Sequence, residues 1–356
     1  MAITAKVRDS NIELLRILLM LMIIAHHYVY HSGVADLYNY DHITGNQVFL
    51  ILWGWGGKTG INCFLLITGY FMCKQQFTWK KLLKLYLEIK FYALLIPVIF
   101  WVMGTQPMTL KSCFDNLFGV AINIGQTFAP TFIALFLLIP FINKLVNALD
   151  KRSHLLLLAI LLLIFTVTSS FFRNVSEDRV AWYVTVYLIG AYLRQYPPAK
   201  LQNFKNCAWL AVISLSLCAA SMLFFAFTKQ TFGFSNYHLV EDSNKLLAIL
   251  GAVSLFCLFK SINLGHICWI NRIATATFGV FLIHDQPYVR DWLWHKVLCC
   301  KDYFTSDGLW LHAIFAMLIV YLTCVVIDML RQRLIEKPFF AWLGKKYPAI
   351  EIGRDI

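Results

Sequence analysis

The sequence predicts an all-α integral-membrane protein that crosses the bilayer about ten times and has both termini in the cytosol. Of its 356 residues, 59% are hydrophobic and only 14% are charged, whereas soluble domains are ~45–50% apolar and ~25% charged. Apolar runs of close to twenty residues, the length of a membrane-spanning helix, recur along the chain. No long polar linker separates them, so we expect one transmembrane domain over residues 1–356.

The apolar runs give ten expected spans, an even number that places both termini on one side. If that side is cytosolic, the cytosolic segments hold twenty Lys and Arg residues and the outer segments hold seven, as the positive-inside rule requires. This distribution accounts for the formal net charge of +12 without a nucleic-acid partner, because the basic residues form no stripe interleaved with aromatics. The expected spans are approximately 11–31, 48–73, 83–103, 117–143, 154–172, 180–196, 207–228, 244–262, 271–290 and 309–331.

Neither the cysteines nor the N-terminus changes this prediction. The ten cysteines form no C-x-x-C pair and no His/Cys cluster with zinc-ligand spacing, so we predict no metal site. The N-terminus resembles a signal peptide, because basic residues precede an apolar run there. Polar residues within that run and the lack of a small-residue cleavage site indicate a retained anchor.

The first expected span carries four ionisable residues, Glu13, Arg16, His26 and His27. Each costs at least ~2.5 kcal/mol in lipid, so such residues usually face protein or water. Arg16 and His27 are eleven residues apart, which places them on one helix face ~16 Å apart, while His26 points ~80° away. Glu13 precedes Arg16 by one turn and is positioned to pair with it. The alternative is a snorkelling Arg16 with Glu13 as its counter-ion, and interfacial histidines.

The second expected span begins with a glycine-rich stretch that contains Trp55 and Lys58 and leads to Asn62. Glycine at this density lets the backbone approach another helix or a ligand closely. Trp55 either anchors the helix at the membrane interface or stacks on a sugar ring. Lys58 either holds a polar acceptor or snorkels. We assign Trp55, Lys58 and Asn62 to a candidate substrate-binding site.

A basic cluster of Lys80, Lys81 and Lys84 stands at the start of the third expected span. Lysine serves as a point charge for phosphate, although it lacks the bidentate fork of arginine. The cluster therefore binds either the phosphates of a ligand or anionic lipid. Glu88 follows Lys84 at i+4, so it pairs with Lys84 or meets Arg16 near the same membrane face.

The ninth expected span contains a second intramembrane histidine, His284, followed by Asp285. If this helix runs outward, His284 lies ~20 Å from its cytosolic end, and His27 lies ~24 Å from the cytosolic end of the first span. The two histidines thus reach a similar depth in the outer half of the membrane. The alternative is that His284 and Asp285 are interfacial polar residues.

Several stretches resemble the acyltransferase-3 family of integral-membrane O-acyltransferases. The family's first helix has an acidic residue, Leu-Arg, ten mostly apolar residues and then His, which matches Glu13, Leu15-Arg16 and His27, with Glu in place of the usual Asp. Three further segments resemble its second-helix, late and closing motifs, namely Asn62 to Tyr70, Phe278 to His284, and Ile335-Glu336-Lys337-Pro338.

The resemblance implies acyl transfer from cytosolic acyl-CoA, most often acetyl-CoA, to a hydroxyl of an extracytoplasmic or lipid-linked glycan. It places the protein in a bacterial cytoplasmic membrane, with a glycan acceptor and membrane lipid as partners. Acetyl-CoA is then a co-substrate, and no tightly bound cofactor is expected. The family associates a basic cluster such as Lys80, Lys81 and Lys84 with the acyl-CoA phosphates.

Acyl transfer to a hydroxyl needs a base, and the ordinary pKa of histidine suits that task. We predict His27 as the base and His284 as a residue that orients the acceptor or His27. Arg16, paired with Glu13, is expected to line the donor channel. The sequence has no G-x-S-x-G elbow that would indicate an acyl-enzyme.

Two other function classes use the same residues differently. A proton-coupled transporter also needs intramembrane Arg, His and Glu. Against it, the ionisable residues cluster in the first span, and the sequence shows no clear inverted repeat. A structural partner in envelope glycan synthesis would make His27 dispensable, so release of CoA by the purified protein separates an enzyme from both.

Overall fold

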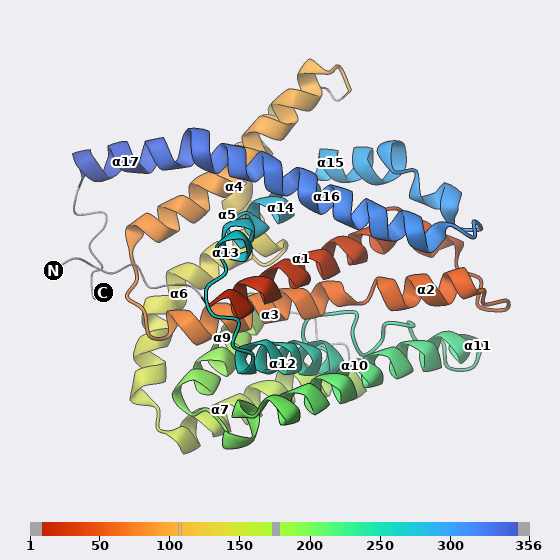
Figure 1. Cartoon of the computed structure of the whole chain (residues 1–356), viewed down its shortest axis with the longest axis horizontal. Helices are drawn as coiled ribbons and strands as arrows, with labels where there is room; N and C mark the ends of the chain where they lie inside the picture. The colour runs from red at the N-terminus through yellow and green to blue at the C-terminus, as the bar shows by residue number, and fades with distance from the viewer. Residues whose placement is uncertain (1–8, 106, 108, 173–178, 348–356) are drawn as a thin grey trace.

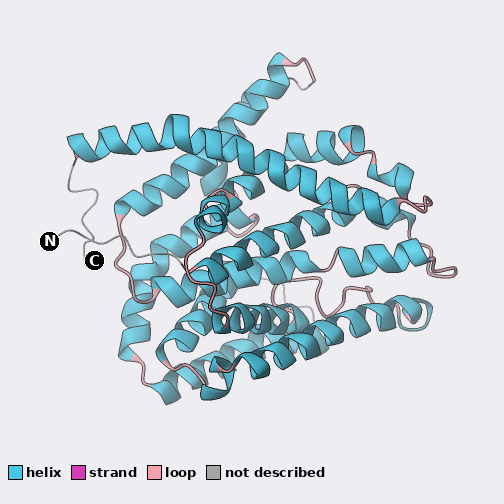
Figure 2. Ribbon diagram, in the orientation of Figure 1, coloured by secondary structure: helices cyan, strands magenta, loops and turns pink. Residues whose placement is uncertain are grey.

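The protein is an all-helical bundle, as predicted. The computed structural model describes residues 9–105, 107, 109–172 and 179–347, and these ranges contain no strand (Figure 2). The α-helices are α1 (Ser10–Tyr30), α2 (Gly45–Trp53), α3 (Gly56–Met72), α4 (Trp79–Val102), α5 (Leu110–Ile122), α6 (Phe128–Ala148), α7 (Lys151–Leu162), α8 (Thr168–Phe171), α9 (Arg179–Gln195), α10 (Phe204–Phe227), α11 (Lys229–Phe232), α12 (Leu246–Ser261), α13 (Cys268–Ala274), α14 (Thr277–His284), α15 (Pro287–Trp292), α16 (Leu309–Arg331) and α17 (Lys337–Lys346).

Seven helical segments among the described residues are long and apolar enough to cross a membrane. They are Ser10–Tyr30, Gly45–Met72, Trp79–Val102, Phe128–Ala148, Lys151–Phe171, Phe204–Phe227 and Leu309–Lys346. The other expected spans coincide with shorter helices: α9 has 17 residues, α12 has 16, and the ninth span is divided among α13, α14 and α15. The chain is therefore a polytopic membrane protein with several interrupted or short helices.

One expected span, 117–143, is wrong in its bounds. Helix α5 ends at Ile122 and α6 begins at Phe128. Between them Gly125 adopts a left-handed conformation, with φ of +80°, and its N–H donates to the hydroxyl of Thr131. Glycine adopts this conformation without strain, so it permits the turn. Apolar residues continue on both sides of the turn, and for this reason hydropathy does not mark it.

Helix α1 packs among α3, α12, α13 and α16 at the centre of the bundle (Figure 1). The glycine-rich stretch makes its contact with α3 possible. A Cβ atom at Gly57 would collide with the ring of His26, and one at Gly56 would collide with Met22. The predicted close approach is thus an approach to α1, which fixes the helix that carries His27.

A second close helix pair supports the first. A Cβ at Gly69 of α3 would overlap the backbone of Tyr187 in α9, and a Cβ at Gly190 would overlap the backbone of Leu66. Small residues at such crossings let membrane helices approach closely. At its start, α1 is tied to distant segments: Asn11 donates to the carbonyl of Phe259 over 2.8 Å, and the hydroxyl of Ser10 accepts from the N–H of Ile267.

Helices α16 and α17 form one continuous rod through a π-helical turn at Gln332–Glu336 (Figure 1). The 38 residues from Leu309 to Lys346 extend ~57 Å at 1.5 Å per residue, about twice the thickness of the hydrocarbon core. The last turns therefore project beyond the membrane. Arg331 lies ~33 Å from the start of this rod, at the end of the bundle that the charge distribution predicts to be cytosolic.

Candidate functional site

His27 of α1 and His284 of α14 form a buried bonded pair. Nδ1 of His27 lies 3.0 Å from Nε2 of His284, and the two residues are 8% and 0% exposed. Nδ1 of His284 lies 2.6 Å from the carbonyl oxygen of Val280, one turn earlier in its own helix. Because a carbonyl only accepts, His284 donates its Nδ1–H there, and the lone pair of a neutral His284 is on Nε2. His27 then donates from Nδ1, which leaves the lone pair of His27 on Nε2.

Polar groups surround this pair at the C-terminal ends of α1 and α14. Oδ1 of Asp285 lies 3.7 Å from Nδ1 of His27, 3.4 Å from Nε2 of His31 and 3.2 Å from Nη2 of Arg290. The same Nη2 also donates to the backbone carbonyl of Asp285 over 2.9 Å. The carboxylate is thus held beside two imidazoles of one helix and a guanidinium of another.

A cavity of about 1090 Å³ lies between α1, α3, α4, α6, α14 and α16. Neither His27 nor His284 lines it, and the lining residue nearest to them on α14 is Phe281. One end is aromatic, and Phe281 stands at that end. The ring of Phe281 is 6.4 Å from the ring of His27 and 5.2 Å from the ring of Phe128. The aromatic lining residues are Phe64, Phe128, Phe132, Phe136, Phe278 and Phe281.

The other end of the cavity is rich in cations. Arg16 and Ile23 of α1 both line the cavity. Arg16 precedes Ile23 by two helical turns, and Ile23 precedes His27 by one turn. The predicted donor residues Lys81 and Lys84 line the basic end together with Arg272, Arg333 and Lys337. An amphipathic anion, apolar at one end and charged at the other, matches this lining.

A smaller groove of about 460 Å³ adjoins the basic end between the start of α4 and α17. Lys84 and Lys337 line both hollows, and the predicted residue Lys80 lines the groove with Lys345. Of the three predicted lysines, Lys81 thus lines the cavity, Lys80 lines the groove and Lys84 lines both. Glu13 is buried, at 5% exposure, on the first turn of α1.

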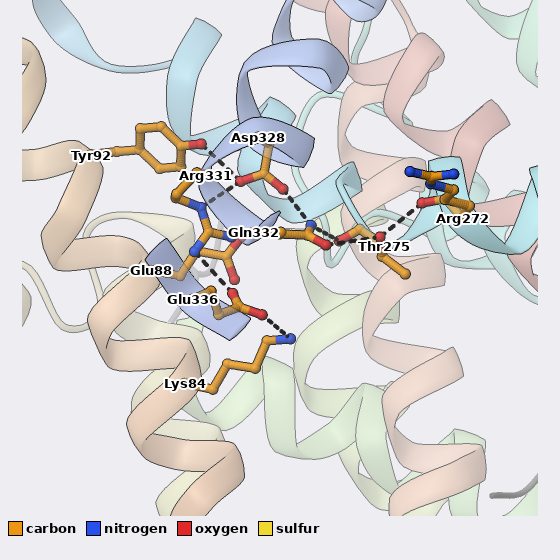
Figure 3. Close-up of polar contacts among 9 residues, drawn as sticks. All are labelled: Lys84, Glu88, Tyr92, Arg272, Thr275, Asp328, Arg331, Gln332 and Glu336. Atoms are coloured by element: carbon orange, nitrogen blue, oxygen red, sulfur yellow. Dashed lines mark hydrogen bonds and ion pairs between the residues drawn. The ribbon is translucent and has the colours of Figure 1, made fainter. Parts of the chain in front are cut away.

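Beside the cavity, an ion cluster is centred on Arg331 of α16 (Figure 3). Its guanidinium donates to Oδ1 of Asp328 over 2.8 Å, and to oxygens of Glu88 and Glu336 over 2.9 Å each. Nζ of Lys84 lies 2.6 Å from Glu336, so the expected pairing of Lys84 with Glu88 is replaced by this contact. Buried charges persist only where partners of opposite charge and hydrogen bonds compensate them, and this cluster supplies both.

The cluster also fixes the break between α13 and α14. Gln332 donates to Oδ2 of Asp328 over 2.7 Å and to the backbone carbonyl of Thr275 over 3.1 Å (Figure 3). Close packing continues along α14, because a Cβ at Gly279 would collide with the carboxylate of Asp328. The helix that carries His284 is therefore positioned by residues of α16 and the following turn.

The residues predicted to bind substrate lie elsewhere, toward the N-terminal end of α3. Lys58 is 3.7 Å from Oδ1 of Asp242, and Trp55 packs in a separate apolar cluster. Asn62 is fully buried; it donates to the carbonyl of Ser243 over 2.6 Å and accepts from Trp182 over 3.0 Å. None of the three lines the cavity that the described residues form. Their role in substrate binding stays a prediction.

Sequence reasoning did not identify Asp328 and Arg331 as a site, and counted Arg272 and Arg333 only as cytosolic charges. A signal was present, because Asp328 is a carboxylate inside the last apolar span, and such a group needs a partner. Its i+3 neighbour Arg331 is that partner. The third member, Glu88, comes from 243 positions away and has no local signature.

Comparison with known proteins gives one match. A family model described as an acyltransferase domain matches residues 9–329. This range contains both histidines and most of the cavity wall, and it ends two residues before Arg331. No curated protein and no solved structure matches the chain.

Proposed function

We propose that this chain, which belongs to the acyltransferase-3 family and is a membrane acyltransferase, transfers an acyl group from cytosolic acyl-CoA to a hydroxyl group. The acyl group is acetyl in the first instance, and the hydroxyl belongs to an extracytoplasmic or lipid-linked glycan. The observation that carries the proposal is the bonded pair of His27 and His284 beside the aromatic end of a cavity whose other end is basic. We propose the bacterial cytoplasmic membrane as its location.

The two ends of the cavity suit the two ends of an acyl-CoA. Lys81, Arg272 and Arg333 at the basic end offer charge-assisted contacts to phosphate, which are the stronger class of hydrogen bonds. The phenylalanines at the other end suit the pantetheine arm and the acyl group, because ligand pockets are mostly apolar with a few placed polar groups. Arg16 lies on the wall between these ends, which supports its predicted place in the donor channel.

His27 is the base in this proposal. Its Nε2 takes the proton of the acceptor hydroxyl, and the oxygen attacks the carbonyl carbon of the thioester. The tetrahedral intermediate breaks its C–S bond, and the CoA sulfur leaves with the proton that His27 returns. The products are the acylated hydroxyl and CoA thiol, and no acyl-enzyme forms. The acyl-CoA and the glycan acceptor approach His27 from opposite sides, which brings the thioester carbonyl close to the acceptor hydroxyl.

His284 keeps His27 in the active tautomer. Its own Nδ1–H is occupied by the carbonyl of Val280, so its Nε2 accepts from His27. A partner that fixes the tautomer and the ring orientation is the usual companion of a catalytic histidine. Of the two predicted roles of His284, this geometry supports orientation of His27.

Thiol release by the purified protein tests the proposal. Protein in lipid nanodiscs is supplied with acetyl-CoA and a glycan acceptor, and CoA thiol and O-acetyl groups are measured. We expect equal amounts of CoA thiol and O-acetyl groups. Formation of both should depend on the acceptor and should be lost in His27→Ala. A transporter or an assembly partner would release no thiol above the rate of empty nanodiscs, and that result would overturn the proposal.

A further inference from the structure

Three possible metal ligands converge at the outer end of the histidine pair. His27 lies in the last turn of α1 and His31 is the C-cap residue of that helix, and their ring centroids are 4.5 Å apart. Nδ1 of His27, Nε2 of His31 and a carboxylate oxygen of Asp285 all lie within 4.8 Å of one another. Two histidines at i and i+4 on one helix face are a zinc-binding spacing. The third ligand comes from the end of α14, so the site spans two elements.

The separations suit a single ion. Zinc binds imidazole nitrogen and carboxylate oxygen at ~2.0–2.2 Å, which in a tetrahedron places neighbouring ligand atoms ~3.4 Å apart. Oδ1 of Asp285 is 3.4 Å from Nε2 of His31 and 3.7 Å from Nδ1 of His27. Nδ1 of His27 and Nε2 of His31 lie within 4.8 Å of each other, so rotation of the two rings toward each other would bring all three atoms to bonding distance. Three protein ligands leave a fourth position for water.

The donor set and its surroundings select the class of ion. Two imidazoles and one carboxylate favour zinc and similar transition metals over magnesium or calcium, which prefer oxygen. The positive charge of Arg290 disfavours a bound cation, because Nη2 of Arg290 is 3.2 Å from Oδ1 of Asp285, one of the three ligand atoms. Its bond to the backbone carbonyl of Asp285 can hold the guanidinium in place when the carboxylate turns to an ion. The side chains of His31 and Asp285 are 25% and 22% exposed, so the ligands are accessible.

Metal binding and base catalysis exclude each other at His27. A metal at Nδ1 uses the lone pair of that nitrogen, so a neutral ring carries its proton on Nε2. Nε2 is the atom that acts as the base in the proposed function, and the bond from Nδ1 to His284 is lost as well. We propose that His27, His31 and Asp285 form a zinc site at the outer end of the bundle and that zinc bound there inhibits acyl transfer. The inhibition rests on the proposed function; the binding does not.

Binding is measured without substrates. Purified protein in nanodiscs competes with a fluorescent chelator for Zn²⁺, and one ion per chain is expected. His31→Gln and Asp285→Asn should each weaken zinc affinity by at least ~10-fold, as expected when one of three ligands is lost. The matched control is His266→Gln, because the exposed Cys268 lies 3.7 Å from Nδ1 of His266 and offers a competing thiol–imidazole pair. Unchanged affinity in His31→Gln, or loss of binding only in His266→Gln, would overturn the site.

Inhibition is measured on the same samples. Zinc should abolish acyl transfer by the wild-type protein, a chelator should restore it, and His31→Gln should keep wild-type activity without zinc and lose its zinc sensitivity. Equal sensitivity of wild-type and His31→Gln proteins would overturn the inhibition. If no preparation transfers acyl groups, the proposed function fails, while the chelator competition still decides the zinc site.

Discussion

Nδ1 of His27 lies 3.0 Å from Nε2 of His284, although 257 positions separate the two residues. The contact joins the first helix of the bundle to a short helix near the end of the matched domain. It also determines which nitrogen of His27 holds the lone pair, because His284 is itself fixed by the carbonyl of Val280.

His284 is a positioning residue, so its replacement should lower kcat without changing the KM for acetyl-CoA. His284→Leu cannot accept the hydrogen bond of His27, and we expect kcat to fall roughly 100-fold, the scale of a general-base contribution. His284→Gln keeps an acceptor and should retain more activity than His284→Leu. Steady-state kinetics on both variants decides the point; equal losses would indicate that packing, and not the hydrogen bond, is what His284 supplies.

The basic end of the cavity should recognise the phosphates of the donor. Arg272→Gln and Arg333→Gln should each raise the KM for acetyl-CoA roughly 3- to 10-fold, since a partly exposed charge contact contributes on the order of 1 kcal/mol. Neither should change the KM for an acetyl-pantetheine donor that lacks the phosphates. Arg152→Gln, an exposed charge outside the cavity, is the matched control. Equal effects on both donors would argue against phosphate binding at these residues.

Arg331 should be critical for stability, because it is bonded to three carboxylates. Arg331→Met leaves these charges uncompensated, and loss of one partner of a buried ion pair costs ~3–5 kcal/mol. Thermal unfolding in detergent should show a large decrease in midpoint temperature, while the exposed neighbour change Arg333→Met should have little effect. The added change Glu88→Gln should recover part of the loss. Equal midpoints for Arg331→Met and Arg333→Met would contradict this account.

Gly57 should tolerate no side chain, because a Cβ there would collide with the ring of His26. Gly57→Ala should lower the free energy of unfolding by ~1–3 kcal/mol, the usual cost of overpacking, and should reduce transfer by displacing α1. Gly45→Ala is the control, since a Cβ at Gly45 meets nothing within 4 Å. The same thermal assay measures both; a neutral Gly57→Ala would show that α1 and α3 can separate without cost.

Local patterns were enough to predict the helix class and to place Arg16 and His27 on one helix face; the role of His27 as a base stays a prediction. Apolar run length marks most helices, and the helical repeat places Arg16 and His27 on one face whatever packs against it. The similar depth of His27 and His284 also follows from helix rise once the topology is chosen. The first two features depend on residues within one span, and the shared depth needs only the predicted direction of each helix.

Features that depend on contacts between spans could not be predicted. The pairing of Glu88 with Arg331 crosses 243 positions, and the approach of Asp285 to His31 depends on how α14 packs against α1. The turn at Gly125 lies between two apolar segments, so hydropathy continues through it. Asn62 is polar and lies in the N-terminal half of α3, yet tertiary packing gives both the nitrogen and the oxygen of its side-chain amide partners within the protein.

The most direct test of the central claim is the content of bound acyl groups on the surface glycan of the producing cell. Cells with the wild-type gene, His27→Ala or His26→Gln are compared at equal membrane expression; His26 is the adjacent histidine, bonded instead to the carbonyl of Gly54. The account predicts loss of O-acetyl groups in His27→Ala and their retention in His26→Gln. Unchanged O-acetylation in His27→Ala would contradict the assignment of His27 as the base, and unchanged O-acetylation after deletion of the whole gene would contradict the glycan acyltransferase role.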